Sequence, residues 1–146
     1  MIQTMTLVVP SHPRYLCVIR SALQPLLLDE GFSEKEARTI VLAIDEACSN
    51  IIKYAYEQDS SKTIAMTLHF GGETLTVELK DTGKKPDLAK ITPRKLDEIR
   101  PGGLGTHFIS SVFDTVTYDT SGAEGTLLTL IKLKPAAEPG RLPHET

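Results

Sequence analysis

The sequence lacks several features by which large classes of protein are recognised. It has 16 basic residues against 19 acidic ones, a net charge of −3, so the basic excess of a general nucleic-acid binder is absent. The longest purely aliphatic run is five residues, Ile40 to Ile44, which is too short to cross a bilayer. We therefore expect neither direct nucleic-acid binding nor membrane insertion.

Cysteine is also scarce. Cys17 and Cys48 are the only two, they lie 31 positions apart, and the four histidines are scattered, so a structural zinc site is not expected. Both thiols are expected to be small core residues, and this cysteine usage suits a reducing cytosol. The first four residues lack the basic-then-apolar pattern of an export signal. We expect a cytoplasmic protein.

What remains is the composition of an ordinary globular protein. The 146 residues are 40% hydrophobic and 24% charged, which favours one compact domain. We expect this domain to span residues 1–134. Residues 135–146 contain three prolines and no apolar run, so we expect them to form a disordered tail.

Two helices are expected in the first half of the chain. Apolar residues at helical spacing predict an amphipathic helix over residues 14–29, with Ser11 available as a cap and Pro25 kinking or shortening it. Gly31 is expected to end it. Ser33 and Glu36 fit a capping box, in which the serine accepts from the third amide and the glutamate reaches back. A long apolar stripe then predicts a helix to about Tyr56.

Alternating apolar residues predict strands. The clearest case is a hairpin over residues 63–70 and 74–80, with one buried face. A polar connection over 81–101 is longer than usual and suggests a functional lid, part of which, 94–99, has helical character. The remaining expected elements are a strand over 4–9, a glycine-rich turn over 101–105, a helix over 106–113, and strands over 115–119 and 126–134.

This order of elements predicts an α+β fold. Strands paired as hairpins, with the helices collected on one face, give a two-layer α/β sandwich around a mostly antiparallel sheet.

Glu46 and Asn50 form the first candidate site. They lie one turn apart on the long helix, away from its apolar stripe. A carboxylate and an amide oxygen at that spacing can together hold a hard cation or its water shell. By itself the pair also suits a solvated helix face.

Three further motifs are only weak evidence of a ligand-binding site when each is taken alone. Asp81 ends a strand and Gly83 follows it, which suits a flat ligand but is also a common turn signal. The glycine-rich turn precedes a helix, where backbone amides suit phosphate oxygens, yet it is neither a P-loop nor a convincing dinucleotide fingerprint. Gly125 and Thr126 open the last strand. The Thr126 hydroxyl can face a ligand there, but the two residues also suit an ordinary exit from a hairpin.

The order and spacing of these motifs are more specific than any one of them. The sequence resembles the Bergerat ATP-binding fold shared by gyrase, heat-shock chaperone ATPases, histidine kinases and mismatch-repair ATPases. Within that superfamily it looks like the small bacterial anti-sigma-factor serine/threonine kinases. The likeness covers roughly residues 5–134, and is carried by residues 42–56 and 100–105. We do not expect a full sensor histidine kinase, because this sequence shows no dimerisation and phosphoacceptor helix pair before the domain.

The resemblance implies a role for each matching residue. Asn50 would coordinate a Mg²⁺ ion that bridges the phosphates of ATP, and Glu46 would be the base that takes the proton of an attacking hydroxyl. Asp81 would accept from the adenine amino group, and Gly83 would leave room for the ring. The remaining nucleotide contacts would come from Arg100, from Gly102, Gly103, Leu104 and Gly105 around the phosphates, and from Thr126 at the adenine.

The resemblance also implies partners. The acceptor would be a Ser or Thr on an anti-sigma-factor antagonist, and the chain would sequester a sigma factor or a similar regulator. A homodimer is expected on the same ground.

One departure from the superfamily pattern keeps alternatives open. Many relatives have a second glycine after Gly83, whereas this chain continues Lys84, Lys85, Pro86, Asp87. The main hypothesis is an ATP-dependent kinase that also sequesters a partner. The irregular segment after Gly83 motivates a second hypothesis, in which the protein is a nucleotide-gated binding module with little or no catalysis. A third is a plain interaction domain without nucleotide.

Overall fold

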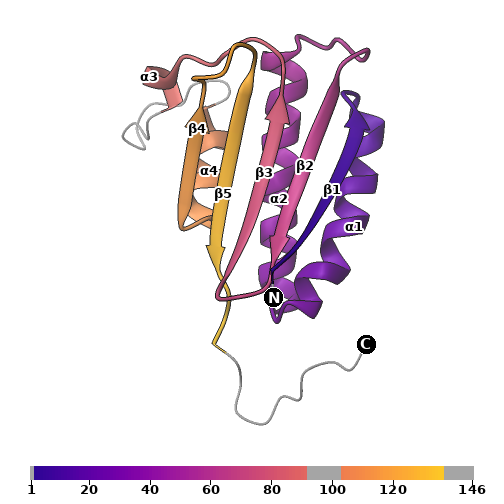
Figure 1. The fold of residues 1–146 in the computed structure, drawn as a ribbon, viewed down its shortest axis with the longest axis vertical. Helices are drawn as coiled ribbons and strands as arrows, with labels where there is room; N and C mark the ends of the chain where they lie inside the picture. Colours follow the sequence, from indigo (N-terminus) through magenta and orange to yellow (C-terminus); the bar gives the residue numbers. More distant parts are fainter. Residues whose placement is uncertain (1, 92–102, 137–146) are drawn as a thin grey trace.

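The computed structural model describes residues 2–91 and 103–136. Five strands form one sheet in the order β1-β2-β3-β5-β4, and every neighbouring pair is antiparallel. The described helices pack against one face of this sheet (Figure 1). The elements are β1 (Gln3–Pro10), α1 (Leu16–Asp29), α2 (Glu34–Asn50), β2 (Thr63–Phe70), β3 (Thr74–Asp81), α3 (Leu88–Ile91), α4 (Gly103–Val112), β4 (Thr115–Asp119) and β5 (Thr126–Leu133). The predicted two-layer α+β sandwich is confirmed.

The predicted hairpin is β2 and β3. Buried side chains alternate along both strands, and the register pairs Leu68 with Val77. Gly71 and Gly72 both adopt positive φ in the turn, the conformation that glycine allows without steric cost. The expected hairpin between β4 and β5 is also present, and β5 pairs with β3.

The first helix differs from the prediction at its start. A 3₁₀ turn over Pro13–Tyr15 precedes α1, and its cap is His12, whose Nδ1 accepts from the amide of Arg14 at 3.1 Å. The expected cap, Ser11, is wrong: its hydroxyl is buried and has no hydrogen-bond partner among the described residues. Pro25 lies inside α1 and does not shorten it.

The ends of α1 and the start of α2 follow the prediction closely. Gly31 has φ of +100°, and its amide donates to Leu28, which ends the helix. Ser33 Oγ accepts from the amide of Glu36 at 3.1 Å, as a capping box requires. The Glu36 carboxylate, however, accepts from the Ser33 hydroxyl at 3.0 Å.

The second half of the chain corrects one expected boundary. The helix predicted over 106–113 begins earlier, so Gly103, Leu104 and Gly105 form the first turn of α4 and do not lie in a turn before it. Their amides are therefore the free amides of a helix N-terminus. The helical segment expected over 94–99, most of the lid and residues 137–146 of the expected tail lie outside the described residues.

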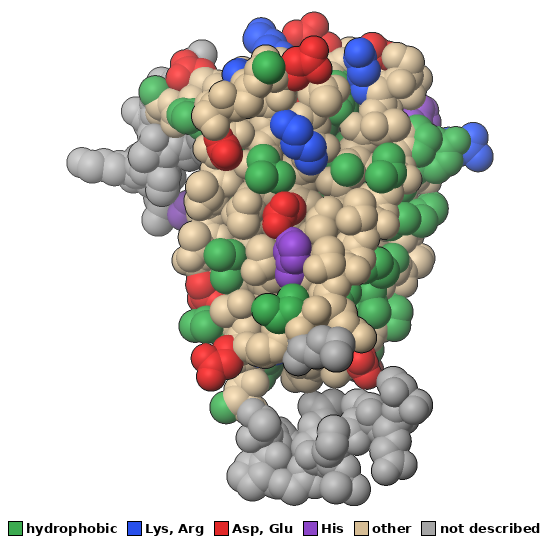
Figure 2. All heavy atoms as spheres, in the orientation of Figure 1, with side chains coloured by type: hydrophobic (Ala, Val, Ile, Leu, Met, Phe, Trp, Pro, Cys, Tyr) green, Lys and Arg blue, Asp and Glu red, His purple; other side chains and the backbone are tan. Residues whose placement is uncertain are grey.

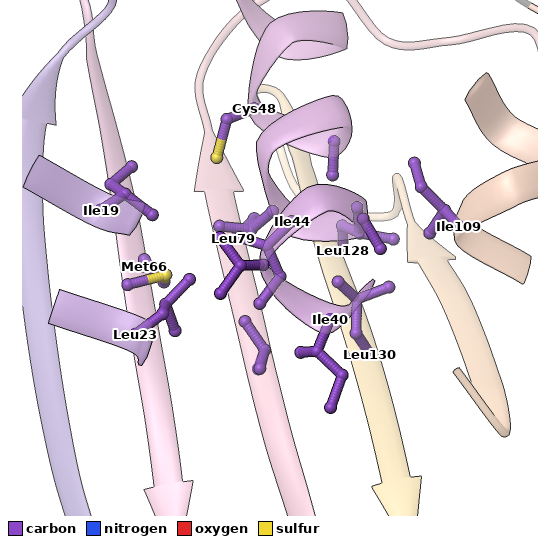
Figure 3. Packing of buried hydrophobic residues seen from close by; sticks show 14 of the residues in the cluster. Ile19, Leu23, Ile40, Ile44, Cys48, Met66, Leu79, Ile109, Leu128 and Leu130 are labelled. Atoms are coloured by element: carbon purple, nitrogen blue, oxygen red, sulfur yellow. The ribbon is translucent and has the colours of Figure 1, made fainter. Parts of the chain in front are cut away.

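The core lies between the sheet and the helices (Figure 3). Burial raises the pKa of the Cys48 thiol to about 12, as the expected core position implies, whereas Cys17 is exposed, so that expectation was wrong for it. The side chains that meet in this layer come from α1, α2, α4 and three strands: Ile19, Leu23, Ile40, Ile44, Cys48, Met66, Leu79, Ile109, Leu128 and Leu130.

The opposite face of the sheet carries no helix among the described residues. Figure 2 views the molecule from this side, where charged side chains of both signs and histidine stand among other residues. Across neighbouring strands, His69 Nε2 lies 2.6 Å from Glu78 Oε1, and Thr6 Oγ1 lies 3.0 Å from Thr67 Oγ1. None of the helices in the described ranges is long and apolar enough to span a membrane.

A matched pair of substitutions on α2 tests which of its faces holds the fold together. Ile44 is 0% exposed and Leu42 is 57% exposed. Ile44→Ala should lower the free energy of unfolding by about 2–5 kcal/mol, because it leaves a cavity. Leu42→Ala should change it by less than about 0.5 kcal/mol. Urea denaturation checks both, and equal losses would contradict the assigned core.

Candidate functional site

The topology brings four chain segments to one end of the sandwich (Figure 1). Strand β3 ends where β5 begins, because Asp81 pairs with Thr126. Strand β4 ends beside the start of β5, so α4, which leads directly into β4, begins at this same end. The C-terminal end of α2 also arrives here, since the amide of Lys84 donates to the carbonyl of Ala55 at 2.7 Å. The predicted site segments therefore converge.

Glu46 and Asn50 lie half-buried on the last turns of α2. Ala43 and Ala47 flank them on the helix and are fully packed, so the pair sits at the border between the core and the surface. Neither side chain has a hydrogen-bond partner within the described part of the chain. Their oxygens are thus available to a ligand from outside the protein.

The helix changes its winding directly after Asn50. Residues Ile51–Ala55 form a π-helical turn, a rare feature that is frequent at functional sites. The chain then leaves the helix through Glu57 and Gln58, which both have positive φ. The carbonyl of Ala55 accepts a hydrogen bond from the amide of Lys84. This bond connects the helical segment that follows Asn50 to the segment after β3.

Asp81 is a carboxylate buried at the end of β3, only 4% exposed. Its Oδ1 accepts from the amide of Gly83 at 2.9 Å. Burial raises the pKa of Asp81, and the Gly83 amide, Lys80 and the Thr126 amide oppose that rise in part. A buried carboxylate with spare lone pairs is suited to accept a hydrogen bond from a ligand.

Thr126 lies directly across the ladder from Asp81, on the same inner face of the sheet. It is 4% exposed, and its Oγ1 is buried without a hydrogen-bond partner among the described residues. Because buried hydroxyls are nearly always paired, an unpaired one calls for an explanation. A polar ligand seated beside Asp81 would supply one.

Two glycines allow the close approach of the strands around Asp81. A Cβ on Gly83 would lie 2.3 Å from the carbonyl oxygen of Ala55, and a Cβ on Gly125 would lie 1.9 Å from that of Asp81. Glycine is therefore required at position 83 because the chain there packs against the backbone of Ala55. That Gly83 leaves room for a ligand ring stays a prediction.

The phosphate end of the predicted site is described only in part. Arg100 and Gly102 lie outside the described residues, and only the backbone of Gly103, Leu104 and Gly105 is described, at the N-terminus of α4. Within the described ranges no group of three or more His, Cys, Asp or Glu side chains could hold a metal ion. That Asn50, one turn from Glu46, holds a metal ion stays a prediction.

Sequence reasoning missed Tyr56, which contacts the segment directly after Asp81. Its hydroxyl accepts from the amide of Thr82 at 2.9 Å and donates to the carbonyl of Thr63 at 2.6 Å. The sequence showed only an aromatic residue at the end of a helical stripe, because the contacts of the phenol lie with other segments of the chain.

Comparison with known proteins now identifies the family. The model of the histidine kinase-like ATPase domain matches residues 9–132. The chain belongs to the histidine kinase-like ATPase family. The proteins it is similar to include the serine-protein kinase RsbW of Bacillus subtilis, at 28% identity over 74% of this chain and 72% of that protein, and RsbW of Listeria innocua, at 29% identity over 76% of each.

A solved structure supports the fold of this family member. The crystal structure of the RsbU and RsbW domains of a Mycobacterium tuberculosis protein superposes with a TM-score of 0.65 at 19% identity. The match covers 92% of this chain, which spans 33% of that longer one. At this identity the likeness concerns the fold alone.

The burial of Asp81 gives a pH-dependent prediction. Because the pKa of Asp81 is raised in the folded state, the folded protein holds the proton more tightly, and the free energy of unfolding should fall as the pH rises above about 4. Asp81→Asn, which can still accept from Gly83, should lack this fall and be more stable than wild type at pH 7. Urea titrations from pH 4 to 7 measure the difference, and identical pH profiles would contradict it.

A second prediction concerns the contact between Gly83 and α2. Gly83→Ala places a methyl group against backbone, which cannot swing away, so the Asp81–Lys84 segment must shift and the protein should lose about 1–3 kcal/mol of stability. Gly122→Ala is the control, because the nearest atom to its Cβ is 3.9 Å away. Thermal melts compare the two, and equal melting temperatures would show that the contact is not tight.

Proposed function

We propose that this chain is an ATP-dependent protein serine/threonine kinase acting as an anti-sigma factor, which phosphorylates an anti-sigma-factor antagonist on Ser or Thr and sequesters a sigma factor or similar regulator. The observation that supports the proposal is that the helix carrying Glu46 and Asn50 runs on to Ala55, which contacts the segment directly after Asp81, the buried partner of Thr126, in a family member whose relatives are named serine-protein kinases.

The adenine end of the nucleotide would bind at Asp81 and Thr126. One carboxylate oxygen of Asp81 already holds the amide of Gly83, and the remaining lone pairs suit the amino group of adenine. The Thr126 hydroxyl, which has no partner in the described part of the chain, would complete its hydrogen bonding on the base, directly or through water. The buried position excludes bulk water, which strengthens both contacts.

The phosphate end would lie between α2 and the start of α4. The free amides of Gly103, Leu104 and Gly105 suit anionic oxygens at a helix N-terminus, and Gly102 and Arg100 would add to them. Mg²⁺ usually keeps several waters and takes one or two protein oxygens besides those of phosphates, so the side-chain oxygen of Asn50 fits it. The metal would neutralise charge on the phosphates.

Glu46 would accept the proton of the attacking hydroxyl. It stands one helical turn before Asn50, so the base and the metal ligand are held by the same rigid helix. Phosphoryl transfer depends on positioning and charge stabilisation more than on covalent chemistry, so a fixed carboxylate within reach of the acceptor hydroxyl is sufficient.

The second candidate is a nucleotide-gated binding module with little or no kinase activity. The segment after Gly83 favours it, because Lys84, Lys85 and Pro86 replace the second glycine of many relatives. In the structure Lys84 is tied to Ala55, and Lys85 Nζ donates to the carbonyl of Gly122 at 2.6 Å. These contacts hold the start of the lid against the body of the domain.

The same proposal includes the cellular location, the oligomeric state and the partners of the protein. We place it in the cytoplasm as a homodimer that binds no nucleic acid and no membrane. The near-balanced charge supports the absence of direct nucleic-acid binding. The sheet face without a described helix is available for contact with a second copy.

Glu46→Gln tests the catalytic role directly. It keeps the size and polarity of the side chain but removes the base, so phosphate transfer to the cognate antagonist with Mg²⁺ and ATP should fall roughly 100-fold or more, with ATP affinity largely unchanged. Phosphorylation of the antagonist and calorimetric binding of ATP measure the two effects.

The matched control is Glu34→Gln, at the exposed first turn of the same helix, which should transfer phosphate as wild type does. Wild-type rates in Glu46→Gln would reject this base. A wild-type protein that binds ATP and its partner but transfers no phosphate would favour the binding module.

A further inference from the structure

The hydroxyl of Tyr56 occupies an unusual place in the sheet. The side chain is 6% exposed and follows the π-helical turn at the end of α2. Its hydroxyl donates to the carbonyl of Thr63, which begins β2, and accepts from the amide of Thr82, the residue after β3. One phenol thus bridges two neighbouring strands at their site end.

The register shows what this bridge replaces. The last pair in the β2–β3 ladder is Ala65 with Lys80, and continuing it by two residues places Thr63 opposite Thr82. Those are the two residues whose carbonyl and amide the phenol binds. The hydroxyl therefore stands where a direct amide-to-carbonyl bond of the ladder would be, and it holds the strand ends further apart than a direct bond would.

The other side of the same strand end remains paired. Strand β3 continues its ladder with β5 as far as Asp81 and Thr126. Asp81 is thus fixed by β5 on one side, while the residue that follows it is fixed by Tyr56 on the other. The ring of Tyr56 also approaches Gly83, whose added Cβ would lie 2.9 Å from it.

We propose that Tyr56 is a positioning residue for base recognition: its hydroxyl, inserted between the ends of β2 and β3, sets the Asp81 carboxylate and links it to the helix that carries Asn50. This inference rests on the proposed nucleotide site. Only five residues, Ile51–Ala55, separate Asn50 from Tyr56, so the phenol transmits the position of the helix end to the base site.

Phenylalanine at position 56 isolates the hydroxyl. Tyr56→Phe keeps the ring against Gly83 but leaves the amide of Thr82 and the carbonyl of Thr63 without their partner. The ends of β2 and β3 should then shift or admit water, and Asp81 should lose its alignment with the amino group of adenine.

The test compares ATP with purine riboside triphosphate, which lacks that amino group. In Tyr56→Phe we expect ATP affinity, measured by calorimetry, to fall roughly threefold to tenfold, while affinity for the analogue is unchanged. In the kinase assay the loss should appear in KM for ATP and leave kcat largely intact. A merely structural role would weaken both nucleotides alike, and an unchanged preference for ATP over the analogue would overturn the proposal.

Tyr118→Phe on the edge strand β4 is the matched control and should keep the wild-type preference. If Tyr56→Phe is only marginally folded, the same ratio is measured for all variants in trimethylamine N-oxide, which favours the folded state. The two levels of failure are distinct. Wild type that does not bind ATP rejects the proposed function and this inference with it, whereas ATP binding with an equal preference in Tyr56→Phe rejects the inference alone.

Discussion

The site depends on one junction, at which the end of α2 is fastened to the end of β3. The amide of Lys84 donates to Ala55, and the amide of Thr82 donates to Tyr56. These contacts join the helix layer, which carries Asn50, to the sheet layer, which carries Asp81, at one end of the sandwich. Gly83 makes the junction possible, because any side chain there would meet the backbone of Ala55. Local backbone packing thus brings a potential metal ligand and a potential base acceptor to the same end of the molecule.

Two buried polar groups that reduce the stability of the protein lie beside this junction. Asp81 is buried although burial raises its pKa, and Thr126 keeps a buried hydroxyl without a partner among the described residues. Both features lower stability in the absence of a ligand. Polar groups arranged in this way are typical of a binding site, where the ligand supplies the missing partners and stabilises the folded state.

Much of the fold could be predicted from the sequence, because its signals are local. Alternation defines the hairpin of β2 and β3, and the Ser33 cap with its apolar stripe defines α2. The order of the site motifs identified the family. What could not be predicted depends on contacts between distant segments: the helical start of α4 at Gly103, the Ser11 hydroxyl that has no partner among the described residues, and the bridge made by Tyr56. No local pattern encodes those contacts, since the partners lie on other elements.

The nucleotide site is tested most directly by an NMR titration of the full chain with ATP and Mg²⁺, following the backbone amides. We expect saturable shifts to concentrate on residues 50, 81–83 and 126, and on the first turn of α4, while the face of the sheet around His69 is unaffected. Saturable shifts confined to other surfaces, or no shifts at millimolar ATP, would contradict the claim that these segments form one nucleotide site.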